Sequence, residues 1–210
     1  MVSEQDYVSG LNGMLMEMME AVETMGDQVH DALVNHKKGM RQQIYDQSKS
    51  IQIKEEEVEE TGIQCMIRYQ PLASDLRAVT VAMKISYDLG RVARYIYNVL
   101  EMNEEFNLRE CDIHQVIELF GDSREMVRQS IRAYLNKDAK MATEICSNDD
   151  SIDNRYRDIL DQYKHQGVFS GECILFNGLT ARIVERMADH ACYISHEVIY
   201  LVTGRRQFYR

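Results

Sequence analysis

Hydrophobic residues recur along this chain at alternating spacings of three and four positions, as on one face of an α-helix. The first series runs from Leu11 to Ala32, enough for about six helical turns, and its many methionines are typical of a core face. Further series predict helices over 40–68, 72–100, 113–135, 139–163 and 174–201. A single proline and eleven glycines leave too few turn clusters for a many-stranded fold, so we expect an all-α protein without a sheet.

Glycine and proline positions fit the ends of these helices. Gly39 and Gly167 are expected to separate helices, and Gly204 to cap the last one. Pro71 stands where a first helical turn tolerates proline. Residues 103–111 carry no clear period and are the best candidate for a linker.

The second half of the chain resembles the first. The segment GRVAR, residues 90–94, aligns with ERMAD, residues 185–189, and Ile51 and Val58 align with Ile152 and Ile159. We therefore expect two tandem three-helix bundles related by internal duplication, at residues 1–105 and 112–210, with neighbouring helices nearly antiparallel.

Charge and composition limit the class of partner. The chain has 34 acidic and 24 basic residues, a net charge of -10, so most of its surface would repel the phosphates of a nucleic acid. The N-terminus lacks a basic segment followed by an apolar one, and no apolar stretch is long enough to span a bilayer, which predicts a cytoplasmic protein. The five cysteines are widely spread and never form a C-x-x-C pair, which favours reduced thiols in the core over a zinc knuckle.

Two pairs of acidic residues at helical spacing are the candidate site. Asp149 and Asp153 are four positions apart, as are Glu185 and Asp189, so each pair lies on one helix face. Four carboxylates on facing helices would repel one another unless they share cations, which predicts a metal site of oxygen ligands. Two exposed acidic faces without a metal are the alternative.

Three further side chains are candidates for extra or supporting ligands: Asp150, His190 and Glu197. We expect His190 to lie on the helix surface or behind the ligands, and His196 to be solvated. The sequence carries no metalloprotease, P-loop or serine-hydrolase motif, and it offers no identifiable nucleophile, so we expect no enzyme.

Two segments resemble motifs of the PhoU family of phosphate-signalling regulators. QPLASDLR, residues 70–77, is similar to the family's Q-P-V-A-x-D-L-R, and residues 185–204, ERMADHACYISHEVIYLVTG, resemble E-R-I-G-D-H-A-x-N-I-A-E-x-V-I-Y-L-V-T-G. With the internal repeat, this resemblance covers essentially the whole chain.

The resemblance implies an all-α fold and a regulatory function. Family members bind metal through E/D-x-x-x-D motifs and repress the phosphate-starvation response by coupling a phosphate ABC transporter to a sensor histidine kinase. They also restrain phosphate uptake, are cytoplasmic and often dimeric, and act at the membrane face, so a homodimer with peripheral membrane association is expected. The metal could be Fe, Zn, Mn or Mg.

The family's ligand positions are kept only in the second half. Asp149, Asp153, Glu185 and Asp189 match the motifs. Their counterparts in the first half are Ser48, Gln52, Gly90 and Arg94, of which Arg94 would repel a cation. We predict that one metal site is kept and the other lost. A one-turn shift in aligning the second helix remains an alternative for Ser48 and Gln52.

Two other functions remain open on the sequence. The first is a helical adaptor protein that has lost its metal. The second is a metal-dependent hydrolase in which the acidic cluster would activate a water molecule.

Overall fold

The structure, a computed structural model, describes residues 4–147, 149–165 and 170–206. Within those residues every regular element is a helix, which confirms the expected all-α fold. In chain order the helices are α1 (Glu4–Val34), α2 (Arg41–Tyr69), α3 (Ser74–Glu105), α4 (His114–Asn136), α5 (Ala139–Ser147), α6 (Asp149–His165) and α7 (Gly171–Thr203).

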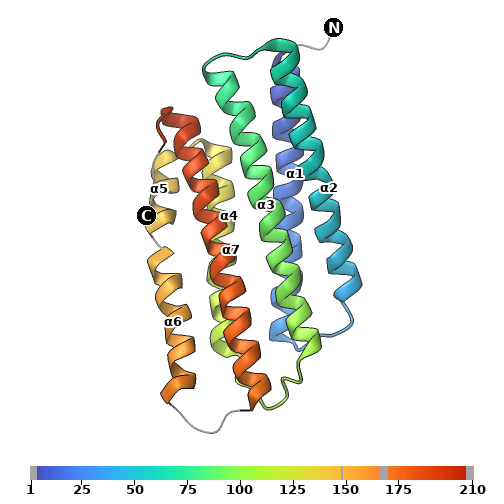
Figure 1. The fold of residues 1–210 in the computed structure, drawn as a ribbon, viewed down its shortest axis with the longest axis vertical. Coiled ribbons are helices and arrows are strands. Elements are labelled where there is room, and N and C mark those ends of the chain that lie inside the picture. The colour runs from blue at the N-terminus through green and yellow to red at the C-terminus, as the bar shows by residue number, and fades with distance from the viewer. Residues whose placement is uncertain (1–3, 148, 166–169, 207–210) are drawn as a thin grey trace.

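The helices lie side by side along the long axis of the molecule (Figure 1). One group consists of α1, α2 and α3, the other of α4 to α7, and α3 packs against α7 where the two groups meet. A single hydrophobic core extends from Leu11 in α1 to Ile199 in α7. The two halves therefore share one continuous interior.

The hydrophobic series of the first helix is confirmed as a core face. Its members are almost completely excluded from solvent: Leu11, Leu15, Met18, Val22, Met25, Val29 and Ala32. Burying such side chains contributes about 1.5 to 3 kcal/mol each for the larger ones, which is why the spacing of this series fixes the helix. Met18, Met19 and Met25 of this helix fill the interior.

Two glycines end helices as predicted. Gly39 has a positive φ of 83° between α1 and α2, and Gly204 has a φ of 69° and donates its N–H to the Tyr200 carbonyl at the end of α7. Both backbone conformations favour glycine. Gly167 lies outside the described residues.

The predicted helix over 139–163 is helical in all its described residues, which the structure gives as α5 and α6. α5 ends at Ser147 and α6 begins at Asp149, on either side of residue 148, which lies outside the described residues. Buried Ala142, Ile145, Ile152 and Ile159 keep one helical spacing through both helices, as the hydrophobic pattern predicts.

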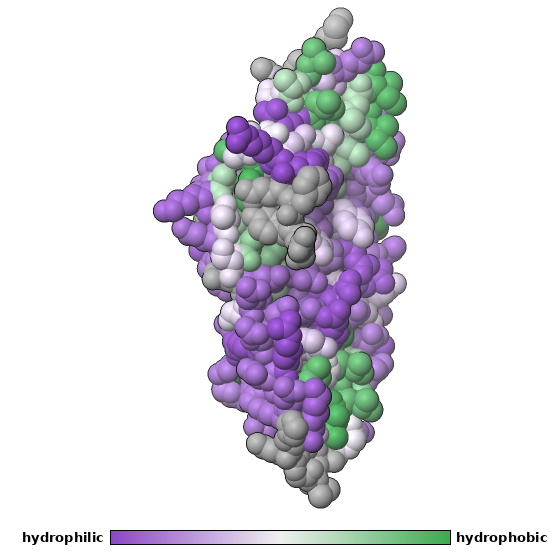
Figure 2. Space-filling view, turned by 60° about the vertical axis from the view of Figure 1, so that its left-hand side comes forward, coloured by the Kyte–Doolittle hydropathy of each residue, from purple (hydrophilic) through white to green (hydrophobic). Residues whose placement is uncertain are grey.

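The third helix begins later, and ends later, than the sequence predicts. Gln70 and Ala73 both have a φ of 48°, which turns the chain before α3 starts at Ser74. Leu72 is consequently 79% exposed, and Ile67, near the end of α2, is 71% exposed. Figure 2 shows hydrophobic surface gathered toward both ends of the molecule. α3 then continues to Glu105, through the first residues of the expected linker.

The expectation of reduced thiols is wrong for two cysteines. Cys111, just before α4, is bonded to Cys173 in the first turn of α7. The Asn177 side chain holds the same two segments together, since its amide donates to the Asp112 carbonyl at 3.0 Å. Cys65 and Cys192 are buried, as expected for core residues.

No helix among the described residues is long and apolar enough to span a membrane.

Candidate functional site

The structure brings the four predicted ligands onto neighbouring faces of α6 and α7. Burial raises the pKa of Asp149 to about 6, with Asp189 and Asp153 as further causes. Burial also raises the pKa of Asp189 and of Glu185, to which Asp153 adds in both cases. Asp149, Glu185 and Asp189 therefore each experience the charge of other carboxylates of this set, as the spacing of the two pairs predicts.

Arginines hold two of these four carboxylates. Arg182 contacts Glu185 at 2.5 Å, and Arg157 contacts Asp153 at 3.1 Å. The second carboxylate oxygen of Glu185 is buried and has no hydrogen-bond partner. Among residues 4–147, 149–165 and 170–206, no three Asp, Glu, His or Cys side chains are gathered closely enough to hold a metal ion.

The donor set nevertheless fits a hard or borderline cation. All four side chains supply carboxylate oxygens, the ligands preferred by Mg²⁺ and Mn²⁺ and accepted by Fe and Zn. A cation would relieve the repulsion that adds to burial in raising the pKa values of Asp149, Glu185 and Asp189, and it would give the unpartnered oxygen of Glu185 a partner. Binding would require these side chains to converge by rotation and Glu185 to leave Arg182.

Two of the counterpart positions in the first half, Gln52 of α2 and Arg94 of α3, also contact each other across neighbouring helices. With the Gln52 amide oxygen turned toward the guanidinium, Gln52 accepts hydrogen bonds from Arg94 at 2.8 and 3.1 Å. This pair stands where Asp153 and Asp189 stand in the second half, which supports the alignment of the two halves at Gln52. An amide and a guanidinium replace two carboxylates here, so these two positions of the first half offer no anionic oxygen to a cation.

A carboxylate from another position occupies the space beside Gly90. A Cβ atom at Gly90 would collide with the Glu55 carboxylate, so the glycine makes room for that side chain. Burial and the neighbouring Glu59 and Glu56 raise the pKa of Glu55 to about 7. Sequence analysis missed Glu55 because it stands in a run of glutamates that is typical of a solvated helix face.

Replacing Glu55 with glutamine is expected to change how stability depends on pH. The pKa of Glu55 is higher in the folded protein than its usual value of 4.5, so the folded state holds the proton more tightly. Wild-type stability should therefore fall as pH rises from about 4.5 through 7, and Glu55→Gln should remove that loss. We expect the variant to be more stable by about 1 kcal/mol at pH 8, because solvent screens a half-buried group.

Thermal melts of both proteins at pH 5 and pH 8 measure this effect. Glu60→Gln, at an exposed position of the same helix, is the control and should leave the pH dependence unchanged. Equal pH dependence in the wild type and Glu55→Gln would contradict the raised pKa.

His190 is buried, so its expected surface position is wrong. Its Nδ1 lies 2.7 Å from the Asp88 carboxylate of α3, and both side chains are 8% exposed. Burial raises the pKa of Asp88, whereas the hydrogen bond to His190 opposes that shift. The pair joins α3 to α7, and the charge of His190 also acts on the neighbouring Asp189, whose pKa it lowers.

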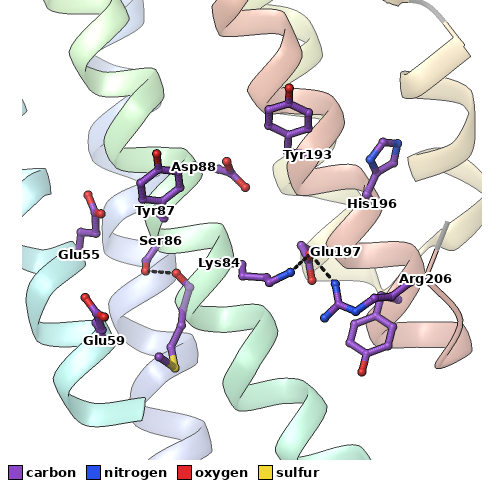
Figure 3. Close-up of a pocket in the computed structure, with 12 residues that line it drawn as sticks. Glu55, Glu59, Lys84, Ser86, Tyr87, Asp88, Tyr193, His196, Glu197 and Arg206 are labelled. Carbon is purple, nitrogen blue, oxygen red and sulfur yellow. Dashed lines mark hydrogen bonds and ion pairs between the residues drawn. The ribbon is translucent and has the colours of Figure 1, made fainter. Parts of the chain in front are cut away.

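A pocket of about 490 Å³ lies on the α3 side of α7 (Figure 3). Glu55 and Glu59 of α2 form one wall, and Lys84 contacts Glu197 across the pocket at 2.8 Å. Arg206 contacts the same carboxylate at 3.2 Å. Glu197 is thus held by two cations in this pocket, which corrects its assignment as an extra metal ligand.

The charges of this pocket disfavour an anion. Both cationic side chains on its described lining contact Glu197, whereas the lining also includes three more carboxylates, those of Glu55, Glu59 and Asp88. A free phosphate ion would enter a negative potential here.

These features define an all-α protein whose two halves present corresponding pairs of helix faces, with carboxylates at the four aligned positions in the second half only. A model of the PhoU domain family matches residues 15–102 and again residues 116–198. The chain belongs to the PhoU domain family, and the resemblance seen in the two sequence motifs is confirmed.

Individual relatives agree with this assignment. A phosphate-specific transport system accessory protein PhoU homolog from Zymomonas mobilis is 30% identical over 205 residues, which cover 95% of this chain and 86% of that protein. The crystal structure of PhoU from Pseudomonas aeruginosa matches with a TM-score of 0.86 at 25% identity, over 97% of this chain and 100% of that one. PhoU from Streptococcus pneumoniae, at 21% identity and a TM-score of 0.88 over 99% and 100% of the two chains, shares the fold.

Proposed function

We propose that this protein is a cytoplasmic negative regulator of phosphate uptake and of phosphate-starvation signalling. It acts through a phosphate ABC transporter and a sensor histidine kinase, as a homodimer that associates with the membrane face. The observation that carries the proposal is the match to the PhoU domain family in both halves of the chain. The printed descriptions of its relatives as accessory proteins of phosphate-specific transport support it.

A metal ion at Asp149, Asp153, Glu185 and Asp189 is part of this proposal. Burial and neighbouring carboxylates of the set raise the pKa values of Asp149 and Asp189, and with the unpartnered oxygen of Glu185 this supports a cation there. By binding only the folded protein, such an ion would hold α6 against α7 and stabilise the surface these helices present to a partner. Its role is structural or regulatory, because the site offers no nucleophile and no general base beside a substrate pocket.

Deletion of the gene tests the regulatory function. We expect higher phosphate uptake and expression of phosphate-responsive genes in phosphate-replete medium, and restoration of both by a plasmid copy. Unchanged uptake and unchanged transcription in the deletion strain would contradict the proposal. Neither result depends on the metal, so the test separates the function from the site.

A helical adaptor without bound metal is the second candidate. Arg157 and Arg182 already neutralise two of the four carboxylates, and the described residues contain no gathered metal ligands, which favour this reading. Complementation distinguishes the two candidates. An Asp149→Asn/Glu185→Gln copy should fail to restore regulation if metal is required, and should restore it fully if the protein is an adaptor.

A further inference from the structure

Corresponding arginines of the two halves meet at the junction of α3 and α7. Arg91 of α3 and Arg186 of α7 occupy the same position in the aligned segments GRVAR and ERMAD. The Nη2 atom of Arg91 donates to the Tyr95 phenol oxygen at 2.9 Å, and the Nε atom of Arg186 donates to the same oxygen at 3.2 Å. Two guanidinium groups from different halves therefore converge on one oxygen atom.

Neither guanidinium forms an ion pair with a carboxylate in the part of the chain that the structure describes. The charge of Glu55 acts on Arg91 only from a longer distance, and Glu185 and Asp189 act on Arg186 in the same way. Other arginines of this acidic chain do contact carboxylates, among them Arg41, Arg124, Arg155 and Arg182. Two like charges held together repel each other, so an anion that contacts both would stabilise the arrangement.

The Tyr95 hydroxyl adds a third donor. A phenol oxygen accepts hydrogen bonds through its lone pairs and donates one through its proton. The two arginines occupy the accepting side, and no residue in the described ranges accepts the proton. Tyr95 is 6% exposed, and its ring centroid lies 5.6 Å from that of His190, so packing fixes the position of the phenol. Two cations and one hydroxyl thus offer donors at one point.

We propose that Arg91, Arg186 and Tyr95 form a binding site for inorganic phosphate. A tetrahedral phosphate can turn a separate oxygen toward each of three donor groups, whereas a carboxylate has only two oxygens. Guanidinium groups match phosphate oxygens with paired N–H donors. Arg91 is half-buried and Arg186 is exposed, so an ion can reach both from solvent. The proposal rests neither on the metal site nor on the regulatory function.

The first half also lacks two carboxylates that would oppose an anion here. Gly90 and Arg94 flank Arg91 in α3, at the positions that Glu185 and Asp189 occupy in α7. Arg94 is exposed and adds a further positive charge on this side. A bound phosphate would replace the repulsion between the two arginines by two ion pairs, and would thereby hold α3 and α7 together.

Isothermal titration calorimetry of the full-length protein with sodium phosphate tests the proposal, with sodium chloride at equal ionic strength as the blank. We expect saturable binding of one phosphate per chain, both before and after treatment with a chelator. Arg91→Gln, Arg186→Gln and Tyr95→Phe should each weaken binding at least about tenfold, because each removes a donor to a charged ligand. Arg132→Gln, at an exposed position of α4, is the control of equal charge change and should bind like the wild type.

Four results would overturn the proposal. The first is no saturable binding of phosphate, and the second is wild-type affinity in both arginine variants. The third is loss of binding after chelation, which would place the phosphate on a bound metal. The fourth is binding of glycerol phosphate at least tenfold tighter than that of the free ion, which would make an ester the ligand. Circular dichroism checks that each variant is folded, and Arg186→Gln changes an exposed position, which keeps the test decisive.

Discussion

Removal of the Cys111–Cys173 disulfide is expected to lower the free energy of unfolding by about 4 kcal/mol. The bond joins positions separated by 62 residues, and a cross-link of that length restricts the unfolded chain strongly. It closes a loop that contains α4, α5 and α6, so in the unfolded chain all three helical segments remain tethered by it. The expected value is near the upper end of what single disulfides contribute, which is about 2 to 5 kcal/mol.

Urea denaturation of Cys111→Ser/Cys173→Ser beside the wild type measures this loss. Reduction of the wild type with dithiothreitol should lower its stability to that of the double variant, and should leave the variant unchanged. Cys146→Ser/Cys192→Ser is the control with the same number of replaced sulfurs, and it should be far less destabilised. A double variant as stable as the wild type would contradict the expected contribution of the bond.

Replacement of His190 with alanine is expected to cost about 3 kcal/mol. The change leaves the Asp88 carboxylate buried against α7 without its 2.7 Å partner, and a buried charge that loses its partner is expensive. Asp88 can escape part of this cost by taking up a proton, because burial already raises its pKa. The loss should therefore be smaller at pH 5 than at pH 8.

A double-mutant cycle with Asp88→Asn isolates the contact. Asp88→Asn keeps a hydrogen-bonding side chain toward His190 and removes only the charge, so it should cost about 1 kcal/mol. The double variant should be more stable than the sum of the two single losses predicts, since both changes remove the same interaction. Additive losses would show that the two side chains are not coupled.

The helices could be predicted largely because burial dictates their spacing. The spacing of the series from Leu11 to Ala32 fits only a helix, since those side chains must share one face to reach the core. The same holds for α5 and α6, in which buried Ile145 and Ile152 keep the spacing that the sequence predicts. The predicted start of α3 at Leu72 was wrong, because Leu72 is hydrophobic yet 79% exposed and precedes the helix.

The candidate site was predictable only within single helices. The spacing of Asp149 with Asp153 places two carboxylates on one face whatever the rest of the fold does. Contacts between distant segments leave no such pattern: Asp88 and His190 are 102 residues apart, and Cys111 and Cys173 are 62 apart. The first-half positions were recognisable by alignment, but the approach of Glu55 to Gly90 needed the structure.

The metal content of the purified protein tests the central claim most directly. Protein prepared without chelator would be analysed for elements beside Asp149→Asn/Glu185→Gln, with Glu144→Gln/Glu172→Gln as a control of equal charge change at exposed positions. We predict bound metal in the wild type and the control and none in the Asp149 variant. Metal at 100 times its Kd should restore about 2.7 kcal/mol of stability to stripped wild-type protein. Absence of metal from the wild type, with no change in Tm on addition of Mg, Mn, Fe or Zn, would contradict the site.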